Sequence, residues 1–388
     1  MNHKRLLSQI VSLLLVMLVS AACGAAQPTA TPVPPTATPV PPTATPVPPT
    51  ATAAPAAAAT PSPTTMPSLS PSPRGYHSMA YDAESDRVIL FGGVTGGDAQ
   101  AGTWTDNAET WAYDVTADQW TQMKPPSGPT GRGAAALAYD AESDRVILFG
   151  ESNEVDGWDL DDTWAYDYNA NTWTETAKGP AKHLGARIAY DAESDRIILF
   201  GGFDMTSGRY YTDTWAYDYN TDTWTEMKPS TSPPGRNYQA IAYDAESDRV
   251  LTWGGMGLDG KLLAPSVWSY DFNTNSWEEM KTGEGPHPQG ADYPAMVYDA
   301  KADRTILFGG EYQGDETWAY DYNTNTWTDL KPSTVPGKLS RHAMVYSTAA
   351  DRVILFGGQV GPTNFKYTGE TWTYDLNTNT WTNVTPQP

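Results

Sequence analysis

The chain of 388 residues is long enough for two or three ordinary domains or for one large domain built from repeats. Its 46 Asp and Glu outnumber its 24 Lys and Arg, and the net charge of −22 argues against nucleic acid as a partner, because such a field repels phosphate backbones. The 15 Trp and 22 Tyr are too many for a disordered polymer, and a single Cys excludes an intramolecular disulfide framework.

Residues 1–22 have the layout of a secretory signal peptide: a basic start, an apolar run too short to span a bilayer, and small residues that lead to Cys23. The segment resembles the lipobox of bacterial lipoproteins, although Ser20 stands where Leu is usual. We therefore expect lipidation at Cys23, which would anchor the protein through its acyl chains at the outer face of a bacterial membrane. The alternative is an ordinary signal peptide in which Cys23 has no special role.

Residues 23–73 read as a linker rich in Thr, Pro and Ala. The heptapeptide TPVPPTA occurs three times in tandem, at 31–37, 38–44 and 45–51. This composition favours extended polyproline II, which at ~3.1 Å per residue spans roughly 140 Å. The linker would therefore hold the following domain away from the membrane.

From residue 74 onward one pattern is repeated six times. A phrase of the type YDAESDRVILFGG is followed by a phrase of the type TWAYDYNTNTWTEM, and the copies are 48 to 58 residues apart. The first phrase begins at Tyr81, Tyr139, Tyr190, Tyr243, Tyr298 and Tyr346. A period near 50 residues with four strand-like runs per unit predicts a β-propeller. We expect blades at about 74–127, 128–178, 179–230, 231–284, 285–333 and 334–388.

The four expected strands of a unit are named A to D in chain order. Strand A is an alternating run such as 77–81, and strand B is a continuous apolar run such as 87–91 that ends at two glycines. Strands C and D alternate with period two, as at 214–217 and 223–227. The diglycine after an apolar strand, with a Tyr and a Trp behind it, resembles the kelch repeat. The resemblance covers residues 74–388 and implies an all-β, six-bladed propeller with strand A innermost; in one copy Glu151 replaces the second glycine.

Antiparallel blades place the A–B and C–D turns on one rim of the ring, which we call the turn rim. The B–C and D–A connections lie on the other rim, which we call the loop rim. The turns are nearly identical in the six units, whereas the loops differ in length and content. Because an asymmetric site needs unequal loops, we expect any ligand at the loop rim, around the mouth of the central channel.

Basic and imidazole side chains are the first candidates at that mouth. They are Arg74, Arg132, Arg187, Arg236 and Arg341, with His77, His183 and His342. The guanidinium group of Arg can bind a carboxylate, sulfate or phosphate group through two parallel hydrogen bonds. A pair of His residues could act as general acid and base or bind a metal ion. The structural alternatives are pairing with neighbouring acids for Arg and packing for His. The six strand-B arginines, by contrast, recur in register and are expected to bond acids of the turns.

Loop aromatics and acids are the second set of candidates. Trp104, Trp158, Tyr210 and Tyr312 suit a sugar ring or a protein partner, or else they pack one loop over the next. One loop is dense in acids and is a weak candidate for Ca²⁺, against the alternative of a solvated acidic loop. Its acids are Glu151, Glu154, Asp156, Asp159, Asp161 and Asp162. No other cofactor is expected.

These features favour a monomeric, surface-tethered binding module for a glycan, an anionic small molecule or a protein. The alternatives are a sugar-modifying enzyme similar to the kelch-type sialic-acid mutarotases and a purely structural envelope protein. A copper oxidase resembling galactose oxidase is set aside, because its Tyr–Cys cofactor needs a Cys that residues 74–388 lack. No catalytic residue is expected, because the sequence shows no nucleophile–base pair, phosphate-binding loop or metal-ligand spacing.

Overall fold

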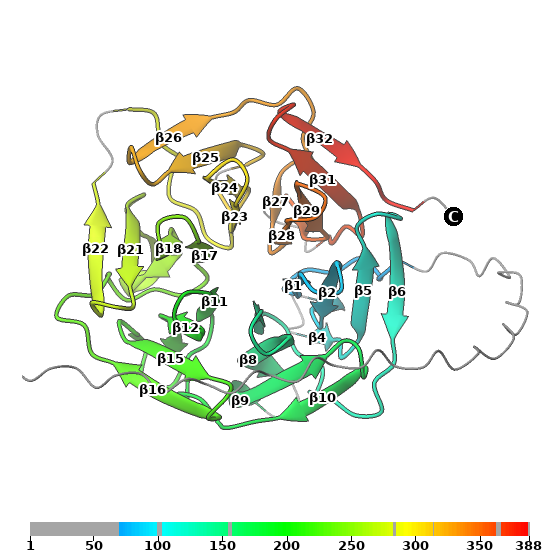
Figure 1. Ribbon diagram of the computed structural model, residues 1–388, viewed down its shortest axis with the longest axis horizontal. Helices are drawn as coiled ribbons and strands as arrows, with labels where there is room; N and C mark the ends of the chain where they lie inside the picture. The colour runs from blue at the N-terminus through cyan, green and yellow to red at the C-terminus, as the bar shows by residue number, and fades with distance from the viewer. Residues whose placement is uncertain are drawn as a thin grey trace, which may run out of the picture. The chain divides into compact units, whose positions relative to one another are not determined.

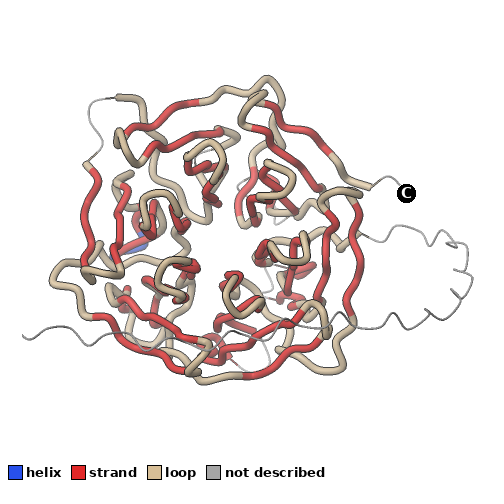
Figure 2. Tube along the Cα trace, in the orientation of Figure 1, coloured by secondary structure: helices blue, strands red, loops and turns tan. Residues whose placement is uncertain are grey.

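In the computed structural model, the described residues are 70–98, 103–153, 157–281, 285–312, 314–361 and 366–386. They form six four-stranded antiparallel sheets arranged as blades around a central axis (Figure 1). The all-β, six-bladed propeller is therefore confirmed. In the tube view every blade contains strands that are joined by loops and turns (Figure 2).

Each blade contains strands A to D in chain order. The first three blades are β1 Ser78–Asp82, β2 Arg87–Phe91, β5 Thr110–Asp114, β6 Gln119–Met123; β7 Ala136–Asp140, β8 Arg145–Asn153, β9 Gly157–Asp167, β10 Thr172–Glu175; and β11 Arg187–Asp191, β12 Arg196–Phe200, β15 Thr214–Asp218, β16 Thr223–Met227. The last three are β17 Ala240–Asp244, β18 Arg249–Trp253, β21 Val267–Asp271, β22 Ser276–Met280; β23 Ala295–Asp299, β24 Arg304–Phe308, β25 Thr317–Asp321, β26 Thr326–Asp329; and β28 Ala343–Ser347, β29 Arg352–Phe356, β31 Thr371–Asp375, β32 Thr380–Asn383.

Four small two-stranded sheets decorate the loop rim. They are β3 Val94–Asp98 with β4 Thr103–Asp106, β13 Phe203–Asp204 with β14 Arg209–Tyr210, β19 Met256–Gly257 with β20 Lys261–Leu262, and β27 Leu339–Ser340 with β30 Gln359–Val360. The 3-10 turn η1 (Leu258–Gly260) is the one helical element of the described ranges, and no helix in them has the length and apolarity to cross a membrane.

The blades are joined by strand-B side chains and by a tryptophan contact. Strand-B residues such as Ile89 and Leu90 are completely buried between neighbouring blades. In five blades, the strand-D Trp donates its indole N–H to the Thr that opens strand C of the preceding blade. The pairs are Trp120–Thr371, Trp173–Thr110, Trp224–Thr163, Trp277–Thr214 and Trp381–Thr317, with N···O distances of 2.8–3.0 Å. In the sixth interface Val267 stands at the Thr position, and the indole nitrogen of Trp327 has no partner among the described residues.

Every turn of the turn rim is closed by a tyrosine. Its hydroxyl donates to an Asp or Asn five residues later, at 2.6–3.1 Å. The twelve pairs are Tyr81–Asp86, Tyr113–Asp118, Tyr139–Asp144, Tyr166–Asn171, Tyr190–Asp195, Tyr217–Asp222, Tyr243–Asp248, Tyr270–Asn275, Tyr298–Asp303, Tyr320–Asn325, Tyr346–Asp351 and Tyr374–Asn379. The repeated tyrosines and Asx residues thus hold the hairpins in shape.

The strand-B arginines have the structural role expected for them. In five blades, the guanidinium bonds the Asp that ends strand C of the same blade, at 2.7–3.0 Å, as in the pair Arg196–Asp218. In the sixth blade Arg352 instead reaches Asp118 of the first blade, at 3.1 Å. This exception falls where the ring closes.

Closure joins two complete blades, because within the described ranges no sheet mixes strands of the first and last units. The inner strands β1 and β28 pack against each other. Before β1, the Arg74 amide donates to Thr368, and its carbonyl accepts from Gly358. The segment that enters the propeller therefore also closes it, at the loop rim.

Candidate functional site

One residue just before each strand A has left-handed backbone, and the six together form what we call the mouth ring. The members, in blade order, are Tyr76, Ala134, Gly185, Tyr238, Tyr293 and Arg341, with φ between 53° and 73°. In five cases, the amide donates to the carbonyl of the member in the preceding blade, so that backbone hydrogen bonds run around the mouth. The sixth amide, that of Gly185, donates instead to Glu151 Oε2 at 2.7 Å.

Glu151, the residue that departs from the repeat, therefore completes the ring. It is 6% exposed, and its other carboxylate oxygen accepts from the Tyr238 hydroxyl at 3.4 Å. The Ala134 carbonyl, left without the Gly185 amide, lies 3.4 Å from a guanidinium nitrogen of Arg187. Because Glu151 replaces a repeat glycine, its carboxylate stands in for a backbone carbonyl as the acceptor of the Gly185 amide at the channel mouth.

Three tyrosines and an arginine stack at the mouth. Tyr238 lies 4.2 Å from Tyr293, ring centre to ring centre, and Tyr293 meets Tyr76 edge-on at 5.3 Å. The Arg341 guanidinium lies 4.2 Å from the Tyr293 ring centre and 5.1 Å from that of Tyr76. Its Nε donates to the Tyr76 hydroxyl, and its Nη2 bonds Glu311 at 3.1 Å. Bulky left-handed residues at one place are a sign of backbone strain held at a site.

Two further charged groups lie beside this stack. The Arg187 guanidinium lies 5.6 Å from the Tyr238 ring centre and forms no ion pair among the described residues. Asp292 is 1% exposed, and neither carboxylate oxygen has a hydrogen-bond partner in the part of the chain that the structure describes. Burial raises the pKa of Asp292 to about 7, against the opposing charge of Arg341. The channel below holds a cavity of about 130 Å³, lined in part by Tyr76, Arg187, Tyr293 and Arg341.

Of the five predicted arginines, the structure brings Arg187 and Arg341 to the mouth and places the other three inside the fold. Arg74, Arg132 and Arg236 are 0–1% exposed. Each donates to the carbonyl of the glycine that follows strand B in its blade, which is Gly92, Gly150 or Gly254. Arg74 and Arg132 also bond Glu109 and Asp162. The expected basic mouth is therefore corrected: these guanidiniums link strands B and C, because each carbonyl and carboxylate needs a donor there.

The histidines are buried as well. His77 and His342 pack edge-on against Phe356 and Phe308 of the preceding blades, with ring centres at 5.3 and 5.5 Å. Burial lowers the pKa of both to about 3, so both are neutral over the physiological range. His183 stands at the repeat position of Arg74 and Arg132, bonds Asp213 at 3.2 Å and stacks on Tyr211. All three serve the blade structure in this arrangement.

The candidate aromatic residues of the loops differ in how exposed their side chains are. Tyr312 is 76% exposed, whereas Tyr210 is half-buried against Phe203 at 4.6 Å. Trp104 and Trp158 lie on β4 and β9, but their side chains fall outside the described part, and Cys23 falls outside the described residues altogether.

The structure does not gather the acidic-loop candidates into one metal site. Asp161 bonds Lys178 at 2.8 Å, Asp162 bonds Arg132 at 2.6 Å, and Glu151 points to the mouth ring. Glu154 and Asp156 lie outside the described residues, and the Asp159 side chain is not described.

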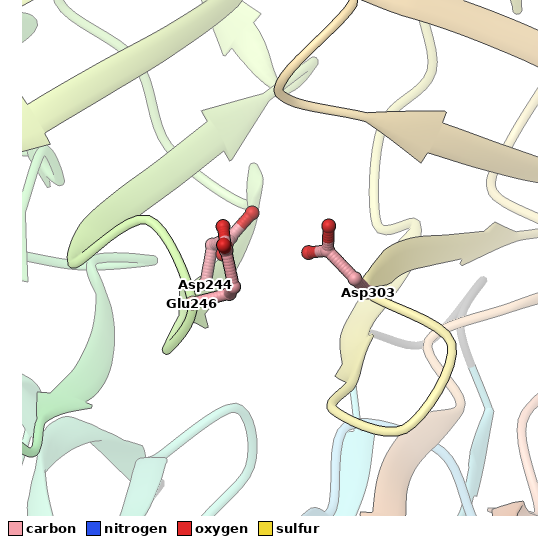
Figure 3. A group of neighbouring side chains, drawn as sticks. All are labelled: Asp244, Glu246 and Asp303. Carbon is pink, nitrogen blue, oxygen red and sulfur yellow. The ribbon is translucent and has the colours of Figure 1, made fainter.

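Another acidic group lies on the turn rim. Asp244, Glu246 and Asp303, from the A–B turns of neighbouring blades, each place a carboxylate oxygen within 4.8 Å of the others (Figure 3). These carboxylates already accept hydrogen bonds from Ser247, Asn323 and Tyr298. The group belongs to the bonded turn structure, and we assign no ion to it.

Sequence reasoning missed the residues that make the mouth distinctive. Tyr76, Tyr238, Tyr293, Asp292 and Glu311 were attributed neither to the repeat nor to the site. Aligning the six units on the first residue of strand A would have shown Tyr two positions earlier in three blades, and Ala, Gly and Arg there in the others. The backbone angle that brings these side chains together is a property of the closed ring.

The exposed apolar surface points to the same rim. Four large hydrophobic side chains of the described residues stay exposed: Met205 at 51%, Leu258 at 73%, Tyr312 at 76% and Val360 at 41%. They lie in the B–C loops of four consecutive blades, the third to the sixth. Apolar side chains concentrated on one face mark an interaction surface more often than scattered ones do.

Comparisons with known proteins agree with the fold. Residues 176–333 match the KLHDC2/KLHL20/DRC7 Kelch-repeats domain, and residues 59–243 match the Attractin/LZTR1 beta-propeller. The chain is 27% identical over 222 residues to the flagellar outer-arm dynein alpha chain of Chlamydomonas reinhardtii, covering 54% of this chain and 5% of that protein. It is 26% identical over 245 residues to Adagio protein 3 of Arabidopsis thaliana, covering 60% and 38%. It is 25% identical over 229 residues to Kelch domain-containing protein 10 of Xenopus tropicalis, covering 55% and 53%. The chain thus spans about half or less of these relatives.

Proposed function

We propose, from the premise that the described domain is a kelch-repeat six-bladed β-propeller, that it is a protein-binding module whose docking face is the loop rim. Kelch propellers typically serve as protein-interaction modules. The observation that carries the proposal is that the exposed Met205, Leu258, Tyr312 and Val360 all stand on this rim, above four consecutive blades. The described part of the turn rim has no such exposed large hydrophobic side chains and consists of hydrogen-bonded hairpin turns rich in acidic residues.

We further propose that the module is tethered outside the cell through Cys23. The signal-like start, the solitary Cys and the Pro/Thr-rich linker support this part. Strand A begins at the loop rim, so the linker enters the propeller on the docking face itself. The expected extended linker, with a reach of roughly 140 Å, would hold the module away from the membrane.

Site-specific photo-crosslinking tests the docking face. A photoreactive amino acid replaces Leu258 or Met205 on the loop rim, or Glu193 or Thr221 on the turn rim, in the full chain on living cells. We expect discrete adducts from the first pair and none from the second. Adducts from the turn rim alone would overturn the assignment of the face.

Metabolic labelling tests the tether. A labelled fatty acid should enter the wild-type protein and be lost in Cys23→Ser. Unacylated wild-type protein in the medium would contradict the anchor and leave the docking face untouched.

A further inference from the structure

We infer that the mouth ring is a cage for a guanidinium group: Arg341 occupies it in the free protein, and an arginine side chain of a protein partner takes its place on binding. The inference rests on the proposed docking face and names the chemistry recognised at its centre. It stands on the arrangement of Tyr76, Tyr293, Arg341 and Asp292.

The rings of the cage already hold one guanidinium. Arg341 lies over two tyrosine faces, at 4.2 Å from Tyr293 and 5.1 Å from Tyr76, and Glu311 neutralises it at 3.1 Å. Cation–π attraction of this kind is worth about 0.5–2 kcal/mol for each contact, more when the pair is desolvated. The site is therefore shaped for a planar cation, and the chain supplies its own.

The cage also has more acceptor capacity than Arg341 uses. Asp292 is 1% exposed, and both of its oxygens are without a partner among the described residues. Gln239 lines the adjoining cavity, and its buried Oε1 is likewise unpartnered there. All of these atoms accept hydrogen bonds, and a guanidinium offers five N–H donors.

The charges at the mouth point the same way. Glu151, Asp292 and Glu311 provide three carboxylates, against the two guanidiniums of Arg187 and Arg341. The chain as a whole carries a net charge of −22, and such a field attracts a cationic group and repels an anionic one. Of the two guanidiniums described at the mouth, Arg187 is the one without an ion pair among the described residues, and an anion bound to it would lie near Asp292.

The space is adequate for the exchange. The cavity of about 130 Å³ borders Tyr76, Tyr293 and Arg341. That is about ten times the ~10–15 Å³ that one water needs. Rotation of the Arg341 side chain into this cavity would vacate the cage without a change in the backbone ring.

The test removes the internal occupant and supplies a free one. Calorimetry measures binding of N-acetyl-arginine amide to the wild-type propeller and to Arg341→Ala, with N-acetyl-citrulline amide as the neutral isostere. We expect at least tenfold tighter binding of the arginine probe to Arg341→Ala and none of the citrulline probe. Asp292→Asn in the Arg341→Ala background should weaken the arginine probe at least tenfold. The affinity should also fall as pH drops below about 7, where Asp292 takes up a proton beside Glu311, Arg187 and Arg341.

A matched control comes from the same rim. Arg209 lies 4.7 Å from the ring centre of Tyr211, in a single-ring contact outside the mouth ring. Arg209→Ala should bind the arginine probe no better than wild type. If Arg341→Ala does not fold, Arg341→Gln serves, and the arginine probe should raise its melting temperature but not that of wild type.

Weaker or equal binding to the Arg341 variants, or a preference for N-acetyl-glutamate amide, would overturn the cage. In that case loop-rim crosslinks would still support the docking face. If no crosslinks form at the loop rim but Arg341→Ala binds the arginine probe tightly, the protein-binding function would be wrong and the cage would be a small-molecule site.

Discussion

Both rims of the propeller contain residues with left-handed backbone, but the residue types at these positions differ between the rims. On the turn rim, all the non-glycine left-handed residues of the described turns are Asp or Asn, the types that adopt this conformation most readily. On the loop rim, the left-handed non-glycine residues are Tyr76, Ala134, Glu151, Lys182, Tyr238, Tyr293, Tyr312, Lys331 and Arg341. None of these is Asp or Asn. The repeated turns thus use the residue types with the lowest conformational cost at positive φ. The loop rim instead places residues with a higher conformational cost at positive φ, where their side chains are needed.

The largest expected effect concerns buried charge. Arg132→Ala on the loop-rim side removes a guanidinium that is 2% exposed, against 29% for Arg196, and takes from Asp162 its bidentate partner at N···O distances of 2.6 and 2.9 Å. We expect a loss of about 3–5 kcal/mol in the free energy of unfolding. The matched turn-rim change, Arg196→Ala, breaks a half-exposed pair with Asp218 and should cost about 1 kcal/mol or less.

Chemical denaturation of the two variants measures this difference. Equal losses would mean that the two rims do not differ in how their ion pairs contribute. By the same reasoning, Arg132→Glu with Arg236→Glu should disrupt the fold, because both side chains are buried.

The pH dependence of stability is the next largest effect. The folded-state pKa of Asp292 is raised to about 7, above the ~3.9 of the unfolded chain, so the folded state binds more protons between these values. Its stabilising contribution is complete below pH 4 and is lost as the pH rises to 7. The loss is on the order of 4 kcal/mol, at 1.36 kcal/mol per pH unit.

Asp292→Asn isolates this contribution, since the amide does not titrate. Thermal melts from pH 4 to 8 should fall less steeply for the variant than for wild type. The turn-rim carboxyls Asp82, Asp140 and Asp191 also have pKa values raised by burial, so part of the slope should remain. A variant curve parallel to that of wild type would show that folding does not raise the pKa of Asp292.

The tryptophan contact between blades offers a gain of stability. Val267→Thr would give the Trp327 indole the acceptor that the other five interfaces have. We expect about 0.5–1.5 kcal/mol of added stability from this hydrogen bond. Thr317→Val, which removes the acceptor of Trp381 at 3.0 Å, is the reciprocal control and should lose a similar amount. Urea midpoints that move in the same direction for both variants would contradict this account.

The smallest expected effect compares the strain of the two rims directly. Tyr312 has φ of 74° with a side chain that is 76% exposed, so Tyr312→Gly should relieve strain and add roughly 0.5 kcal/mol. Asp195→Gly on the turn rim, at φ 54°, should lose a comparable amount, because the carboxylate that holds the Tyr190 hydroxyl is removed. Melting temperatures that shift together would remove the distinction between the rims.

The sequence by itself determined the six blades, because each unit carries its own strands, turns and apolar positions. Period-two alternation, the apolar run of strand B and the paired glycines are local signals, and they recur at every copy. The structural role of the strand-B arginines followed from their fixed register. Residues such as Tyr190 and Asp195 are local too, since they meet within a single five-residue turn.

Only the tertiary structure decided the site. Whether Arg132 or Arg341 reaches the channel depends on which carbonyl or carboxylate lies within reach, and those partners come from positions 18 to 265 residues away. The sequence places both arginines in the same kind of connection, but they have different roles in the structure. Arg132 is buried and joins strands, whereas Arg341 stacks on Tyr293. The mouth ring exists because closure brings six left-handed residues into hydrogen-bond contact, and closure is a property of all six blades at once.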